Sequence, residues 1–241
     1  MPNVYIESTA ISGATAIITG ETARYVLTVL RYKTGGEFCI FDETGRFYKG
    51  TITSCSKNEA HLSITRQPAP NTESPVSITL CQGLLKGAKM DLVVQKAVEL
   101  GVKRIIPMIT NRTQLDYTRK IDRWRKIAIE AARQSMRVAV PEIAEATNFT
   151  VLMESIQATG AATMMFYEGR GKGLKEIREP GQNIYIITGP EGGFTPEEVN
   201  QAEASGATIV TMGNRILRAE TAAISALTLV QFIFGDMGYS R

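Results

Sequence analysis

Histidine and cysteine are scarce in this sequence. Its 241 residues include one histidine, His61, and three cysteines without a close pairing. Since histidine and cysteine are the principal ligands of protein zinc sites, we expect no metal. His61 lies in an alternating apolar and polar segment, which is typical of a strand residue without a catalytic role. The odd cysteine count favours buried thiols in a reducing compartment over a disulfide framework.

Long apolar segments are also missing. No apolar run reaches the roughly 18 residues that a membrane span needs, and the first residues lack the charged-then-apolar pattern of a secretory signal. Hydrophobic residues make up 44% of the sequence and charged residues 21%, a balance typical of a folded globular protein. We therefore expect a cytoplasmic protein with one large domain or two unequal ones.

Two common nucleotide-binding motifs are absent as well. The glycine-rich residues 169–173 lack the GxxxxGK[ST] spacing of an NTPase phosphate loop. No GxGxxG follows a strand-like run, which argues against a dinucleotide-binding fold.

Basic residues are concentrated in the middle of the chain, although the net charge is only +3. Residues 84–141 contain 13 basic and 5 acidic side chains, whereas residues 142–241 contain 7 and 12. A basic segment of this kind suits a polyanionic partner and fast, salt-sensitive association. Part of the charge can equally belong to a solvated helix face.

A proline-rich linker divides the sequence. Residues 67–75 contain three prolines and no hydrophobic periodicity, as in a semi-extended connection. Before it, a helix over 21–30 and strands over 37–42, 47–54 and 60–65 predict a small β-rich unit. After it, strands alternate with helices, which predicts an α/β fold with a mostly parallel sheet. We predict domains of residues 1–70 and 71–241.

Two glycine loops stand out in the second part. The β-branched run 184–188 ends in Gly189-Pro190-Glu191-Gly192-Gly193, and a capping box from Thr195 to Glu198 then predicts a helix start. A second strand-like run, 208–211, ends in the loop 212–218. Each loop alone can be a tight strand-to-helix connection. Together they predict one ligand cleft at the carboxyl ends of two strands.

The segments GPEGGFTPEE and MGNRILRAETAAISAL resemble the SPOUT superfamily of S-adenosylmethionine-dependent RNA methyltransferases. Within it, the sequence is most similar to the small-subunit (16S) ribosomal RNA (uracil-N3)-methyltransferase family. The resemblance implies an N-terminal PUA-like β-barrel, a SPOUT domain with a trefoil knot at about 184–227, and a homodimer. It also implies methylation of a uridine at N3 in ribosomal RNA or an assembled small subunit, during ribosome biogenesis.

The resemblance further implies a cofactor site made from both loops. The expected residues are Tyr167, Thr188, Gly189, Pro190, Glu191, Gly192, Gly193, Met212, Gly213, Ile216, Leu217, Arg218 and Thr221. Arg218 is the catalytic candidate, because charge develops on the uracil oxygens when N3 loses its proton. It can instead brace the second loop through Glu220. The general base stays open between Glu220, an RNA phosphate and solvent.

Six basic residues are candidates for RNA contacts: Arg31, Lys86, Lys89, Arg112, Arg133 and Arg137. Lys86 and Lys89 precede a helix, whose free N–H groups can hold phosphate. Arg31 can equally interact with the carbonyl end of its helix. Two other functions remain open, namely methylation of another acceptor such as a ribose 2′-hydroxyl, and a non-catalytic role in ribosome assembly.

Overall fold

The structure is a computed structural model that describes residues 1–114, 120–178 and 181–238. The chain forms two compact units, one of residues 1–73 with 129–140, and one of residues 74–128 with 141–241. The predicted division near residue 70 places 129–140 in the second domain, whereas the structure groups this segment with the first unit. Two contacts account for this grouping: Arg137 pairs with Glu73, and the Arg133 guanidinium lies 3.8 Å from the ring centre of Tyr25.

The first unit is built on a six-stranded sheet in the order β1-β4-β5-β6-β3-β2. The strands are β1 (Asn3–Tyr5), β2 (Ile11–Ser12), β3 (Thr15–Thr19), β4 (Glu37–Phe41), β5 (Phe47–Cys55) and β6 (Glu59–Gln67). Neighbouring strands are antiparallel except for β1 and β4. Along β6, Ala60, Leu62 and Ile64 are buried and alternate with polar residues, so one face of the sheet carries the core.

The predicted helix over 21–30 has two parts. A short α1 (Gly20–Arg24) continues into a π-helical turn, η2 (Tyr25–Val29). Arg31 follows with φ 58° in the left-handed region, which ends the helical run. A single 3-10 turn, η1 (Ser8–Ala10), lies earlier in the unit.

The second unit contains an eight-stranded sheet in which every pairing that the structure describes is parallel. This confirms the α/β prediction. The strand order is β10-β8-β7-β13-β11-β14-β12, with β9 also paired to β8. The bounds are β7 (Ser77–Gly83), β8 (Arg104–Ile109), β9 (Glu142–Ile143), β10 (Thr147–Asn148), β11 (Ala162–Phe166), β12 (Lys172–Gly173), β13 (Asn183–Thr188) and β14 (Thr208–Thr211).

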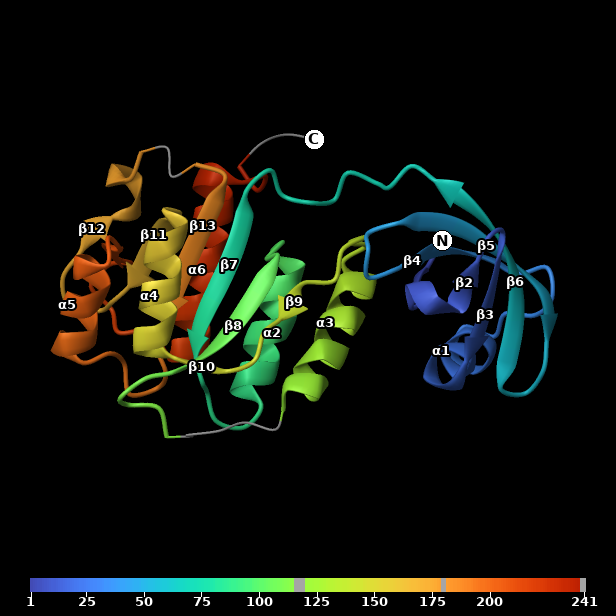
Figure 1. Ribbon diagram of the computed structural model, residues 1–241, viewed down its shortest axis with the longest axis horizontal. Coiled ribbons are helices and arrows are strands. Elements are labelled where there is room, and N and C mark those ends of the chain that lie inside the picture. The colour runs from blue at the N-terminus through green and yellow to red at the C-terminus, as the bar shows by residue number, and fades with distance from the viewer. Residues whose placement is uncertain (115–119, 179–180, 239–241) are drawn as a thin grey trace. The chain divides into compact units, whose positions relative to one another are not determined.

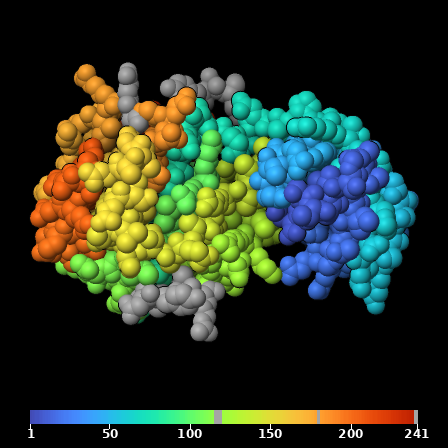
Figure 2. Space-filling model, in the orientation of Figure 1, coloured from blue at the N-terminus to red at the C-terminus, as the bar shows by residue number. Residues whose placement is uncertain are grey.

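Helices cover both faces of this sheet (Figure 1). They are α2 (Lys89–Glu99), α3 (Ile121–Gln134), α4 (Phe149–Thr159), α5 (Pro196–Ala204) and α6 (Ala219–Phe234), with a 3-10 turn η3 (Leu174–Glu176). α4 and α5 pack on one face, and α2 and α6 pack together on the other. In the space-filling view, α4 (yellow) forms part of the surface that faces the viewer, in front of the strands (Figure 2). No helix among the described residues has the length and apolar character to cross a membrane.

Candidate functional site

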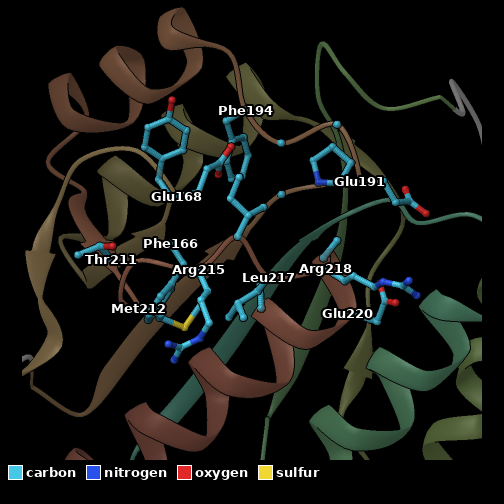
Figure 3. A pocket seen from close by; sticks show the side chains of 18 of the residues that line it. Phe166, Glu168, Glu191, Phe194, Thr211, Met212, Arg215, Leu217, Arg218 and Glu220 are labelled. Atoms are coloured by element: carbon cyan, nitrogen blue, oxygen red, sulfur yellow. The ribbon is translucent and has the colours of Figure 1, made fainter.

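A cavity of about 300 Å³ lies at the carboxyl ends of β11, β13 and β14 (Figure 3). The chain leaves these three neighbouring strands on one edge of the sheet, where ligands of α/β proteins commonly bind. Its walls are the segment after β11, the first glycine loop and the second glycine loop with the start of α6. The lining residues are Lys89, 166–168, 189–194, 211–213, 215–220 and Ala222. The two loops therefore form one cleft, as the sequence predicts.

The cavity contains most of the residues expected to hold a cofactor. Those that line it are Tyr167, Gly189, Pro190, Glu191, Gly192, Gly193, Met212, Gly213, Ile216, Leu217 and Arg218. Thr188 and Thr221 are not among its lining residues. Phe166, Glu168 and Thr211 line it without having been expected, although their positions at two strand ends could have indicated it.

A buried glutamine, Gln82 at the end of β7, fixes the first glycine loop to the sheet. Its Nε2 donates to the carbonyl oxygens of Gly189 (3.0 Å) and Gly83 (2.9 Å). Its Oε1 accepts from the Thr188 hydroxyl (2.7 Å). Thr188, which is only 1% exposed, therefore contacts Gln82 instead of lining the cavity. Sequence analysis missed Gln82, and its one signal was an amide at the end of a strand of small or apolar residues.

The first glycine loop also packs closely against β7 at Gly83. A Cβ atom placed on Gly83 would lie 2.6 Å from Cδ of Pro190 and 2.7 Å from the carbonyl carbon of Gly189. Only glycine therefore lets β7 and this loop approach so closely.

The helix after the loop begins as predicted. The Thr195 hydroxyl accepts from the backbone N–H of Glu198 (3.3 Å), and the Glu198 carboxylate accepts from the N–H of Thr195 (2.9 Å). This confirms the capping box. The second oxygen of Glu198 accepts from the backbone N–H of Asn111 (2.8 Å), a contact that sequence analysis did not anticipate.

Arg218 and Glu220 extend beside each other from the start of α6 (Figure 3). Arg218 is the N-cap residue, and its exposed guanidinium makes no hydrogen bond or ion pair with another described residue. Glu220 lies in the first turn, with a buried Oε2 that has no partner in the described part of the chain. The first turn of α6 also presents free N–H groups and the positive end of the helix dipole. This rim can stabilise negative charge and accept a proton.

Glu191 connects the first glycine loop to the start of α2. Its Oε1 accepts from the backbone N–H of Lys86 (3.1 Å) and from Nζ of Lys89 (3.1 Å). Partial burial raises the pKa of Glu191, but these hydrogen bonds outweigh it, so the net effect is a lowered pKa. Across the described residues, no cluster of three or more potential metal ligands is found.

The candidate RNA contacts fall into two groups. Arg31, Lys86 and Arg112 are exposed, and Arg112 Nη1 donates to the carbonyl of Gly192 (3.1 Å). Lys89 is partly exposed at the cavity rim.

The other two candidates are engaged inside the first unit. The Arg137 side chain is 3% exposed and donates to both carboxylate oxygens of Glu73. It therefore fixes the end of the linker and offers almost no surface to RNA, which corrects the expectation. Arg133, 19% exposed, stacks on Tyr25 and pairs with Glu130.

Comparison with known families identifies the α/β unit and the small β unit as the two parts of an RNA methyltransferase. The RNA methyltransferase domain family matches residues 72–231, and the RNA methyltransferase PUA domain family matches residues 18–65. The chain belongs to the family of ribosomal RNA small subunit methyltransferase E.

The similarity to known relatives extends over nearly the whole chain. The family member from Buchnera aphidicola is 33% identical over 98% of this chain and 95% of its own, and that from Bacillus subtilis is 30% identical over 89% of each. A crystal structure of the Neisseria gonorrhoeae family member bound to S-adenosyl methionine is 33% identical, with a TM-score of 0.91 over 98% of this chain and 99% of that one. A methyltransferase from Legionella pneumophila in complex with SAM is 29% identical, with a TM-score of 0.90 over 98% of both chains.

Proposed function

We propose that the protein methylates N3 of a uridine in small-subunit ribosomal RNA, with S-adenosylmethionine as the cofactor. The observation that carries this proposal is the cavity between the two glycine loops, with Arg218 and the start of α6 at its rim. When bound, the cofactor supplies an electrophilic methyl group on a positively charged sulfur. The lining residues fit it, because glycine backbone can approach it closely and the carboxylates of Glu168, Glu191 and Glu220 suit its positive charge.

Arg218 and Glu220 supply the groups that the acceptor requires. N3 of uracil carries a weakly acidic proton and becomes nucleophilic only as that proton leaves. In our proposal, the carboxylate of Glu220 accepts this proton and later releases it to solvent. The Arg218 guanidinium and the free N–H groups of α6 stabilise the negative charge that develops on the uracil oxygens. The residues that line the cavity would hold the cofactor and orient the acceptor toward it.

Basic residues around the cavity bind the RNA backbone in this account. Lys86, Lys89 and Arg112 surround the first glycine loop, and phosphate contacts of this kind position an RNA without reading its sequence. Arg31, which is exposed, contributes a contact from the first unit. Association with RNA is then expected to weaken steeply as salt increases.

We also infer a trefoil knot and a homodimer. After β14, near one edge of the sheet, the chain returns to pack α6 against β13 and α2, which supports a knot within residues 184–227. Leu229 (38% exposed) and Phe232 (59% exposed) lie one turn apart on α6, an apolar surface that a second copy can cover. Sedimentation of wild type and Phe232→Asp tests the dimer. A dimeric wild type and a monomeric variant support it, whereas a wild-type protein that already sediments as a monomer contradicts it.

Methyl transfer from labelled S-adenosylmethionine tests the proposed reaction. Unmodified small ribosomal subunits and naked ribosomal RNA are offered in parallel, and the RNA is digested to nucleosides for mass spectrometry. We expect labelled N3-methyluridine, and the better substrate shows whether the assembled particle is needed. A 2′-O-methylated nucleoside would overturn the acceptor but keep the enzyme class. Failure to bind S-adenosylmethionine would favour a non-catalytic assembly factor.

A further inference from the structure

Glu198 joins the two loops that, in the function proposed above, hold the cofactor and the RNA. We propose that Glu198 is a positioning residue that couples cofactor binding to RNA binding through the first glycine loop. The inference rests on the proposed function, and it adds a property that the cavity alone does not imply. It follows from three sets of contacts on the outer side of the loop.

Both oxygens of the Glu198 carboxylate are used, one for each loop. Oε2 accepts from the N–H of Thr195 (2.9 Å), which lies two residues after the first glycine loop. Oε1 accepts from the N–H of Asn111 (2.8 Å), in the loop that follows β8. Glu198 is only 4% exposed, and a carboxylate so buried is stable only when its oxygens accept hydrogen bonds. It therefore holds the two loops at a fixed separation.

The next residue in the β8 loop, Arg112, lies against the glycine loop itself. Its Nη1 donates to the carbonyl oxygen of Gly192 (3.1 Å). A Cβ atom placed on Gly192 would lie 2.9 Å from Cβ of Arg112 and 3.2 Å from its carbonyl oxygen. Because the two backbones are in close contact there, a displacement of Gly192 toward Arg112 must move Arg112.

The start of α2 is attached to the same loop. Glu191 accepts hydrogen bonds from Lys86 and Lys89, so three basic residues proposed to contact RNA are each tied to the loop. The residues of that loop line the cavity. A cofactor in the cavity restricts the loop and therefore orders the basic residues before RNA arrives, which lowers the entropic cost of binding RNA. By linkage, RNA must strengthen cofactor binding by the same factor.

The test measures RNA affinity with and without S-adenosylhomocysteine, which fills the cofactor site without turnover. Fluorescence anisotropy of a labelled small-subunit RNA fragment gives the two dissociation constants for wild type, Glu198→Gln and a control, Glu154→Gln. In Glu198→Gln the side chain retains only one acceptor oxygen, so the hydrogen bond to one of the two loops is lost. Glu154 serves as the control because it is an exposed residue on α4. We expect S-adenosylhomocysteine to tighten RNA binding by about fivefold or more in wild type and control, and by less than about twofold in Glu198→Gln.

Calorimetry with S-adenosylhomocysteine separates coupling from damage to the cofactor site. Its dissociation constant, measured without RNA, is expected to change less than about threefold in Glu198→Gln, because loss of coupling does not by itself alter cofactor binding to the RNA-free protein. A wild type that binds S-adenosylhomocysteine without any change in RNA affinity would overturn the inference, as would a Glu198→Gln variant with full coupling. A wild type that does not bind S-adenosylhomocysteine would instead contradict the proposed function.

Amide hydrogen exchange tests the same inference if Glu198→Gln does not fold. In the wild type, S-adenosylhomocysteine is expected to slow exchange in peptides that contain residues 110–113, as well as in those from the cavity loops. Slower exchange in the cavity loops with no change at 110–113 would overturn the inference.

Discussion

Replacing Gln82 by leucine should detach the first glycine loop from the sheet. The change removes three hydrogen bonds and leaves the Thr188 hydroxyl and the Gly189 carbonyl without their partner in a buried site. A lost hydrogen bond costs about 0.5–1.5 kcal/mol, and an unsatisfied buried group about 1–3 kcal/mol. Leucine has a similar volume and recovers part of this through apolar contact. We expect the free energy of unfolding to fall by about 2–4 kcal/mol.

The single tryptophan makes this loss measurable in the second unit. Trp124, at the start of α3, is 1% exposed and donates its Nε1–H to Asp91 (3.0 Å), so its fluorescence reports unfolding there. Urea titrations compare Gln82→Leu with the exposed control Gln157→Leu, which should stay within about 0.5 kcal/mol of wild type. S-adenosylhomocysteine affinity is expected to fall about tenfold, because the loop must then be ordered on binding. A loss of stability below about 1 kcal/mol would refute the reasoning.

Three further predictions concern single side chains. The pKa of Glu191 is lowered in the folded protein, so the ionised carboxylate stabilises the fold above its unfolded pKa of about 4.5, and this stabilisation is lost as the pH falls further. The melting temperatures of wild type and Glu191→Gln should therefore differ at neutral pH and converge near pH 3. A difference that does not depend on pH would contradict this. Burial raises the pKa of the Cys81 thiol, so in mass spectrometry iodoacetamide should modify exposed Cys55 in the native protein and Cys81 only after unfolding; native labelling of Cys81 would be the contrary result. Gly83→Ala should lower the free energy of unfolding by about 1–3 kcal/mol through overpacking against the first glycine loop, as measured by urea titration. A variant as stable as wild type would show that this loop can move away from β7.

The parts of the site that sequence analysis predicts correctly depend on neighbours in the chain. The capping box at Thr195 and Glu198 spans three residues, and the strand over 208–211 has the predicted bounds. Glycine loops that follow such strands must lie at one edge of a parallel sheet. The position of the cavity therefore follows from local patterns alone.

The contacts that fix the site connect distant parts of the chain, and local patterns contain no information about them. Gln82 meets Gly189 across 107 residues, and Asn111 meets Glu198 across 87. Arg137 was expected to contact RNA because its segment resembles the family and because arginine can form paired hydrogen bonds with phosphate or a base edge. Its partner Glu73, 64 residues away, could not be identified from spacing. The two-residue strands β2, β9, β10 and β12 are too short to show a period.

The most direct measurement is single-turnover methyl transfer to small-subunit RNA by wild type and Arg218→Ala, each saturated with labelled S-adenosylmethionine. Loss of a preorganised charge at the reacting group typically costs about 10²–10³ in rate. We therefore predict label in the RNA with wild type, and a rate lower by about that factor in the variant, with cofactor affinity retained by calorimetry. An unchanged rate would contradict the role of Arg218. A collapse of cofactor affinity would make Arg218 a brace of the second loop, and absence of label with wild type would contradict the proposed reaction.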